Sequence, residues 1–139
     1  MKTYLRYTVF VLNLLFSLSV FAQQVDKEKD DFLALVEGSL KASSSRELIK
    51  HLNDKIEVKL DGDRKEYSVN QAEIMLKQFF QQFPSNGFEF DHDGKNASGG
   101  VVYAIGSYNS PGGVHRVVIR ARKFKEVYKV YRLEFTKER

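Results

Sequence analysis

The feature that most constrains the fold of this chain is an apolar stripe between residues 72 and 83. Apolar side chains recur there at steps of three or four residues: Ala72, Met75, Leu76, Phe79, Phe80 and Phe83. This spacing predicts a helix with one apolar face. Ser68 and Gln71 form a capping box ahead of the stripe, and Pro84 ends it. The sequence therefore predicts a well-bounded amphipathic helix.

The segments around this helix have the alternating pattern of strands. Ile56, Val58 and Leu60 alternate with charged residues. Asp61-Gly62 then predicts a tight hairpin turn, with a return strand over 64–69. After the helix, four further strands are predicted, over residues 88–93, 101–108, 114–124 and 127–136. Because short turns join only antiparallel neighbours, successive strands are expected to pair antiparallel.

Two helices are predicted ahead of the hairpin. Residues 30–42 carry apolar side chains at helical spacing, namely Phe32, Leu35, Val36 and Leu40. Ser44 and Glu47 form a second capping box, which predicts a short helix after the break at 43–45. The expected order is helix, helix, two strands, helix and four strands.

The first 22 residues have the layout of a secretory signal peptide. Lys2 and Arg6 precede an apolar run of about 14 residues, shorter than the roughly 20 needed for a transmembrane helix. Val20 and Ala22 place small residues before a cleavage site. We expect export to the bacterial periplasm and a mature chain that begins near Gln23 with a flexible lead over 23–29. No stable membrane insertion is expected after cleavage.

Composition narrows the class of protein. The chain has no cysteine, which excludes disulfides, thiolate metal sites and thiol nucleophiles. An exported domain without disulfides suggests a bacterial envelope protein. The net charge of +4 includes Lys2 and Arg6, so the mature chain is nearly neutral. The chain beyond the predicted signal peptide has the length of one domain.

The order of elements is that of an α+β fold in which N-terminal helices pack in a curved antiparallel sheet, the nuclear-transport-factor-two-like or cystatin-like cone. Within that fold the chain resembles a bacterial family, the domain of unknown function 4783. The matching residues are Tyr67-Ser68, Gln71-Ala72-Glu73, Leu76, Phe79-Phe80, Pro84, Phe88, His92, Gly94, Tyr103-Ala104-Ile105-Gly106, Gly113, Arg116-Val117 and Leu133. The resemblance implies one such domain over residues 30–139, an exported location and no assigned activity.

Three residues are candidates for ligand binding: Tyr67, His92 and Tyr103. His92 follows Phe88 and Phe90 at even spacing, so an unbroken strand would point all three toward the core. An inward histidine is a candidate general base, and the two tyrosines are candidate donors to an oxyanion. No carboxylate is placed to orient His92, so packing roles are favoured for all three.

The final hairpin is rich in basic residues. Arg116, Arg120 and Arg122 share one strand face and form a candidate surface for a polyanion or a protein partner. Tyr128 and Tyr131 lie nearby in sequence, but export argues against a nucleic-acid partner. An acidic glycan, a lipid head group or an acidic protein fits better, and a solvated face that maintains solubility is the favoured interpretation.

No cofactor or metal is expected. The chain lacks a phosphate loop, a serine-nucleophile elbow and a zinc signature. His115 precedes Val117 and Ile119 by two and four positions in the same strand, which predicts that all three side chains face inward. His51 lies late in a predicted helix. These histidines have no matched ligand spacing, so a metal site is rejected.

The sequence therefore predicts an exported, non-catalytic binding or accessory domain. Its expected partner is an unidentified small ligand or an envelope protein. A homodimer formed through the sheet is a further alternative. One alternative is a small cofactor-free isomerase or lyase that uses His92 and a tyrosine donor. Another is a dimerisation module of an envelope assembly that uses the exposed face of the sheet.

Overall fold

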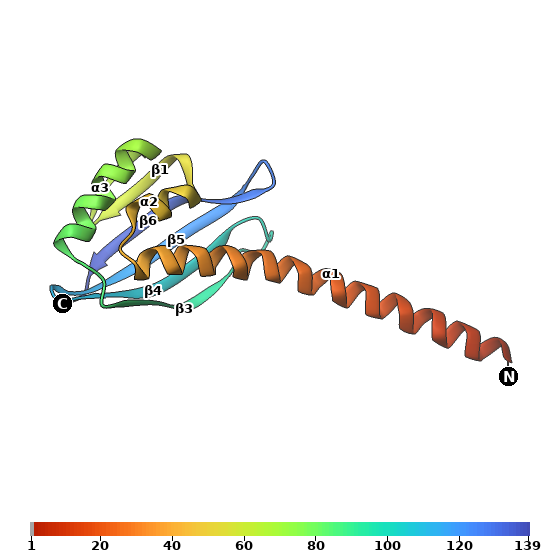
Figure 1. The fold of residues 1–139 in the computed structure, drawn as a ribbon. Helices are drawn as coiled ribbons and strands as arrows, with labels where there is room; N and C mark the ends of the chain where they lie inside the picture. Colours follow the sequence, from red (N-terminus) through yellow and green to blue (C-terminus); the bar gives the residue numbers. More distant parts are fainter. Residues whose placement is uncertain (1) are drawn as a thin grey trace. The chain divides into compact units, whose positions relative to one another are not determined.

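Helices and strands follow one another in the order α1, α2, η1, β1, β2, α3 and β3 to β6 (Figure 1). The structure is a computed structural model that describes residues 2–139, with side chains for 3–12 and 27–139. The chain divides into two units, one that ends at Phe32 and one that spans Leu33–Arg139. The second unit holds the sheet and the sites discussed below.

Helix α1 spans Lys2–Lys41 and therefore begins well before the predicted start at residue 30. No glycine or proline interrupts the sequence before Gly38, which explains why the helix continues through residues 23–29. The predicted flexible lead refers to the cleaved chain and stays a prediction. The predicted cleavage site after Ala22 lies outside the residues whose side chains are described.

The inward face of α1 differs in part from the prediction. In the second unit, Leu33, Val36 and Leu40 are buried. Leu35, for which the sequence predicts an inward position, is 59% exposed. Positions 33, 36 and 40 lie on one stripe of a helix, whereas position 35 lies about 100° away from position 36.

The next elements match the predicted hairpin. Helix α2 spans Ser45–Leu48, a 3₁₀ turn η1 spans Ile49–His51, and strands β1 and β2 span Leu52–Leu60 and Asp63–Ser68. The turn residues Asp61 and Gly62 both have positive φ, 47° and 94°, as a two-residue hairpin turn requires. The predicted return strand ends one residue earlier, at Ser68, because that residue caps the next helix.

Helix α3 spans Val69–Gln82 and has both hydrogen bonds of its capping box. The Gln71 N–H donates to Ser68 Oγ over 3.3 Å, and the Ser68 N–H donates to Gln71 Oε1 over 3.1 Å. At α2 only the first of these bonds forms, from the Glu47 N–H to Ser44 Oγ over 3.1 Å. The Ser44 N–H instead donates to the Ser39 carbonyl oxygen.

The six strands form one sheet in the order β2-β1-β6-β5-β4-β3. The last four are β3 (Gly87–Lys95), β4 (Val102–Ser110), β5 (Gly113–Phe124) and β6 (Val127–Lys137). The two strands of every hairpin pair antiparallel, as predicted. The pair β1 and β6 is parallel, so the sheet is mixed and not purely antiparallel. No turn in the sequence joins these two strands, which is why turn lengths did not reveal their direction.

Helix α3 lies against one face of the sheet, next to β1 and β2, and we call this the inner face (Figure 1). Aromatic rings fill the space between helix and sheet around Phe79. Its ring centroid lies 4.4 Å from that of Phe135, 5.1 Å from that of His115 and 5.7 Å from that of Tyr108. The predicted apolar stripe of α3 therefore forms the centre of an α+β core.

Candidate functional site

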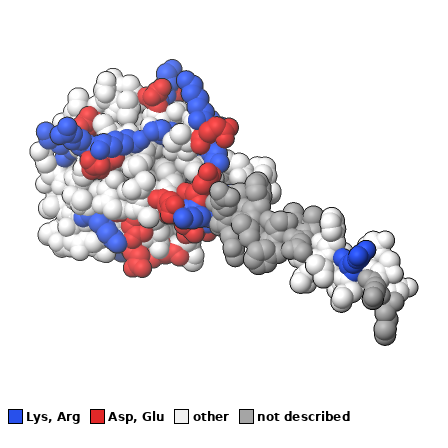
Figure 2. All heavy atoms as spheres, turned by 45° about the vertical axis from the view of Figure 1, so that its right-hand side comes forward, with Lys and Arg blue, Asp and Glu red and all other residues white. Residues whose placement is uncertain are grey.

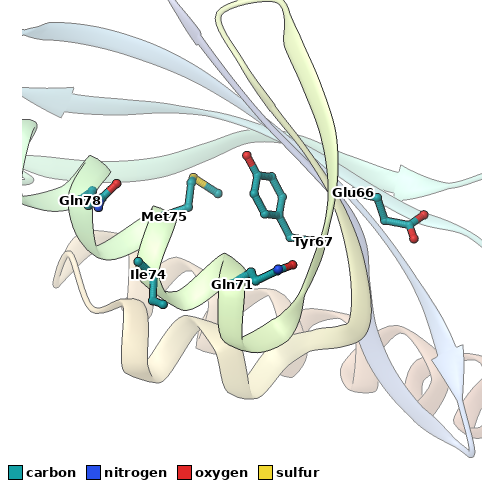
Figure 3. Close-up of a pocket in the computed structure, with 6 residues that line it drawn as sticks. All are labelled: Glu66, Tyr67, Gln71, Ile74, Met75 and Gln78. Carbon is teal, nitrogen blue, oxygen red and sulfur yellow. The ribbon is translucent and has the colours of Figure 1, made fainter.

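Tyr67 lines a surface hollow between the edge strand β2 and helix α3. The hollow has a volume of about 470 Å³, and we call it the Tyr67 hollow; its lining residues are Glu66, Tyr67, Gln71, Ile74, Met75 and Gln78. Figure 3 shows the Tyr67 ring and the Met75 side chain turned toward each other, with the Glu66 carboxylate pointing away from both. Tyr67 is half-buried because it pairs with the core residue Ile56 on β1.

The chemistry of this hollow is mostly neutral. The Tyr67 ring, Met75 and Ile74 supply apolar surface, and Ile74 is 62% exposed. Gln71 accepts its capping bond through Oε1, which leaves its amide N–H groups available as donors. Within the described part of the chain, no protein group hydrogen-bonds the Tyr67 hydroxyl. The hollow can therefore accept an uncharged group with one or two polar atoms.

His92 lies on the other face of the sheet, so its predicted inward orientation is wrong. The pairing of β3 with β4 shifts between Phe90 and His92, and Asp91 is the extra residue of a β-bulge. Phe90 pairs with the buried Gly106, but His92 pairs with Ile105, whose side chain points outward. His92 is exposed as a result.

Tyr103 also belongs to this outer face. It pairs with Gly94 on β3 and is 39% exposed. A side chain at Gly94 would meet the phenol, since a Cβ atom there would lie 2.6 Å from the Tyr103 hydroxyl oxygen. The ring of Tyr103 therefore lies across the bare backbone of β3. Tyr103 and His92 are neighbours on the outer face, while Tyr67 lies on the inner face at the opposite edge of the sheet.

The three candidate ligand-binding residues thus do not form one pocket. The alternative isomerase or lyase needed His92 and a tyrosine donor across an enclosed apolar space. In the structure, His92 faces outward and the Tyr67 hollow lies on the other side of the sheet. The geometry does not support that catalytic arrangement. Whether any of the three binds a ligand stays a prediction.

His115 does face inward, as its parity predicted. It is 1% exposed, and its ring meets Phe79 and Phe83 edge-on, with centroid distances of 5.1 and 4.6 Å. Neither ring nitrogen has a hydrogen-bond partner among the described residues. Burial lowers the pKa of the imidazole below its ordinary 6.5; the nearby Asp61 opposes this shift and Lys137 adds to it. His115 is therefore a neutral core residue.

The predicted basic surface of Arg116, Arg120 and Arg122 is exposed on the outer face. The alternate residues Val117, Ile119 and Ala121 are buried, which confirms that the three arginines share a face. The Arg122 guanidinium lies over two rings, 4.8 Å from the centroid of Tyr131 and 5.0 Å from that of Phe124. Its role toward a polyanion or partner stays a prediction.

Acidic residues share the outer face. Arg64 Nε lies 2.9 Å from Glu57 Oε1, and Arg64 Nη2 lies 3.1 Å from Glu134 Oε1. Arg132 Nη2 lies 3.4 Å from Glu57 Oε2. Figure 2 shows one face of the molecule, on which basic side chains form bands with acidic side chains beside them. The three ion pairs show that the charges of the outer face itself are mixed and not gathered into a single basic patch.

Residues 3–12 and 27–139, whose side chains the structure describes, contain neither a metal-binding cluster nor a helix that could span a membrane. Among them, no three His, Cys, Asp or Glu side chains gather as a metal site would require. Within the same part of the chain, no helix is long and apolar enough to span a membrane.

Sequence reasoning identified Tyr67 but missed its neighbours in the hollow. Ile74 does not belong to the apolar stripe of α3. An apolar side chain outside such a stripe faces solvent and indicates a surface that could contact a ligand or partner, so this residue did carry a signal. The capping box and the family resemblance both include Gln71, but neither indicates that it lies beside Tyr67. Gln78 gives no signal in the sequence. Met75 was assigned to the core, and its half-buried position at the rim of the stripe gives it both roles.

Comparison with known proteins identifies the family and the fold of this chain. Residues 33–136 match the model of a protein family described as a domain of unknown function, DUF4783. A crystal structure of a DUF4783 protein from Bacteroides ovatus is 25% identical, covers 76% of this chain and 94% of its own, and has a TM-score of 0.73. A second one, from Bacteroides uniformis, is also 25% identical, covers 76% and 96%, and has a TM-score of 0.72.

A more distant structure from Nostoc punctiforme, described as a protein of unknown function with a cystatin-like fold, is 8% identical. It covers 81% of this chain and 90% of its own, with a TM-score of 0.64. The comparison with curated proteins found no match. The cystatin-like α+β fold is therefore confirmed, and the chain belongs to the DUF4783 family.

Proposed function

We propose that this chain is an exported, non-catalytic binding protein that holds an uncharged, partly apolar group in the Tyr67 hollow. The observation that carries the proposal is the half-buried phenol of Tyr67, whose hydroxyl has no protein partner in the described part of the chain and whose ring faces Met75. The Tyr67 ring forms one apolar wall of the hollow, its hydroxyl is available as a hydrogen-bond donor, and the amides of Gln71 and Gln78 lie nearby. Such a lining suits recognition of a neutral ligand or side chain.

The lining residues favour binding over catalysis. Glu66 is the one ionised group among them, and its carboxylate points away from Tyr67. General acid–base catalysis needs a side chain aimed into the site that can exchange a proton with the substrate. The lining residues of the Tyr67 hollow include no histidine, aspartate, lysine or cysteine that could take this role. The volume of the hollow and its mostly neutral lining are consistent with a ligand held by packing and a few hydrogen bonds.

The test is native mass spectrometry of the protein purified from the envelope of its own source cells. We expect a non-covalent adduct on the wild type that Tyr67→Ala loses. Tyr103→Ala, which removes a phenol from the outer face, is the matched control and retains the adduct. An adduct that persists in Tyr67→Ala, or a wild type that carries none, contradicts the proposal.

Export is a separate part of the proposal and rests on the sequence of residues 1–22. Intact-mass analysis of the protein from fractionated cells tests it. We expect the periplasmic fraction to contain a chain that begins at Gln23. A chain that retains residues 1–22, or that stays in the cytoplasmic fraction, contradicts export without affecting the binding proposal.

A further inference from the structure

The two edges of the sheet differ in how well they are protected from further pairing. Strand β3, at one edge, is interrupted by the bulge at Asp91. Strand β2, at the other edge, pairs with β1 through six consecutive residues without a shift in register. A regular edge strand presents a row of free backbone donors and acceptors, whereas a bulge disrupts such a row. The β2 edge is the one suited to accept another strand.

The free backbone groups of β2 follow from its turn. In a two-residue hairpin, the residues that flank the turn, here Leu60 and Asp63, exchange hydrogen bonds. Every second residue then points its N–H and C=O groups away from the partner strand. In β2 these residues are Arg64 and Glu66, and no loop or turn backbone bond among the described residues reaches them.

We propose that the occupant of this edge is a second copy of the same chain, paired antiparallel through β2 about a two-fold axis at Lys65. In this register, Arg64 of each copy lies directly opposite Glu66 of the other. Both side chains point to the outer face, because the alternate residues Lys65 and Tyr67 pair with the buried Val58 and Ile56. This pairing does not depend on a ligand in the Tyr67 hollow.

The charges and the length of β2 together favour this register. A shift in one direction places Glu66 opposite the second Glu66. A shift in the other places Arg64 opposite the second Arg64 and leaves only residues 63–65 of each strand paired. Like charges directly across a ladder destabilise it, and opposite charges stabilise it. Arg64 is already held in place by Glu57 and Glu134, while the exposed Glu66 carboxylate has no ion-pair partner in the described part of its own chain.

Two further features accompany the pairing. The central Lys65 residues face each other on the inner face, and Asp63 Oδ2 lies 3.6 Å from Lys65 Nζ within each chain, which reduces their repulsion. Ile74, 62% exposed, shares the Tyr67 hollow with Glu66 and so lies beside the same edge. It offers apolar surface that a second copy would cover.

Sedimentation velocity over a wide range of protein concentration tests the proposal, with charge reversals as probes. The wild type is expected to dimerise, and Glu66→Arg and Arg64→Glu are each expected to be monomeric. An equal mixture of the two variants is expected to form heterodimers, because one chain then carries arginine at both positions and the other glutamate at both. Glu138→Arg, the same charge change at an exposed C-terminal residue, is expected to dimerise like the wild type.

A wild type that is monomeric throughout overturns the proposal, as does a dimer that survives both single reversals. Two monomeric variants that do not combine when mixed overturn the proposed register. A monomeric wild type whose Glu66 N–H is protected from hydrogen exchange by a co-purified peptide overturns it in favour of strand addition by another chain.

Arg64→Glu also removes the ion pairs with Glu57 and Glu134, and both reversals place like charges across the proposed ladder, so a variant that blocks the backbone bonds themselves is needed. Glu66→Pro removes one outward N–H and no ladder bond to β1. We expect it to keep the circular dichroism spectrum of the wild type and to lose the dimer. A dimer that persists in Glu66→Pro contradicts the pairing through β2.

Discussion

The hydroxyl of the buried Tyr108 donates a hydrogen bond of 2.6 Å to the main-chain carbonyl of Phe83, just after the end of α3. The same hydroxyl oxygen lies 3.0 Å from Ser43 Oγ, which accepts a 2.7 Å bond from the Ser85 N–H. One phenol therefore joins β4, the end of α3 and the turn between α1 and α2. Burial raises the pKa of this phenol, which remains the neutral donor.

Removal of this hydroxyl is expected to destabilise the domain. Tyr108→Phe leaves the Phe83 carbonyl and the Ser43 hydroxyl without their partner, and a buried polar group left unpaired costs about 1–3 kcal/mol. Urea unfolding measures the loss. Tyr103→Phe removes an outer-face hydroxyl and should change the free energy of unfolding by less than about 0.5 kcal/mol. Equal effects of the two substitutions would contradict this role of Tyr108.

Phe79 is expected to be the most costly side chain of α3 to truncate. Its ring contacts the rings of His115 and Phe135, and Phe79→Ala leaves a cavity that should cost about 3–5 kcal/mol. Lys77 lies exposed on the other side of the helix, so Lys77→Ala should cost under about 0.5 kcal/mol. Equilibrium unfolding measures the free energy of unfolding of both variants. Similar losses of stability in the two would show that the buried face of α3 has been misassigned.

Stability is expected to fall in acid through His115. Its pKa is lower in the folded chain than the ordinary 6.5, mainly because of burial, so the unfolded chain binds a proton at a higher pH. The free energy of unfolding should therefore decrease as the pH falls below about 6.5, and continue to decrease down to the folded-state pKa. The facing groups are Asp61, Lys137 and the Tyr108 phenol.

His115→Phe is the variant that tests this pH dependence. A neutral ring fits between Phe79 and Phe83, so the variant should lose less stability between about pH 7 and about pH 5 than the wild type does. Burial also lowers the pKa of His51, so the stability of His115→Phe should still depend on pH, but less steeply. His51→Gln should retain the part of the pH dependence that comes from His115. Identical pH profiles for His115→Phe and the wild type would refute the assignment.

Arg120 is expected to reduce stability slightly. It lies directly opposite Arg132 across β5 and β6, and it makes no ion pair among the described residues, whereas Arg132 pairs with Glu57. Like charges in this position destabilise a sheet by about 0.2–1 kcal/mol. Arg120→Gln should raise the free energy of unfolding by about that amount at low salt, and less at high salt.

Arg132→Gln is the matched control for Arg120→Gln, since both replace one arginine by glutamine. It relieves the same repulsion between Arg120 and Arg132 but also loses the pair with Glu57, so its free energy of unfolding should be lower than that of Arg120→Gln. Equal changes in the two variants would show that net charge, and not the individual pairs, determines the result.

The local elements of this fold could be predicted from the sequence. The Asp61–Gly62 turn, the Ser68–Gln71 capping box and the apolar stripe of α3 each depend on residues within a few positions of one another. The antiparallel hairpins followed from short turns for the same reason. These features need no knowledge of distant contacts.

The tertiary structure alone decided which face several residues occupy and which distant strands pair. One extra residue at Asp91 turned His92 from the inner to the outer face, because a strand reverses its side-chain direction at every residue. The parallel pairing of β1 with β6 joins segments that no local turn connects. The Tyr67 hollow exists because β2 and α3 meet at the sheet edge, a relationship set by packing and not by sequence neighbours.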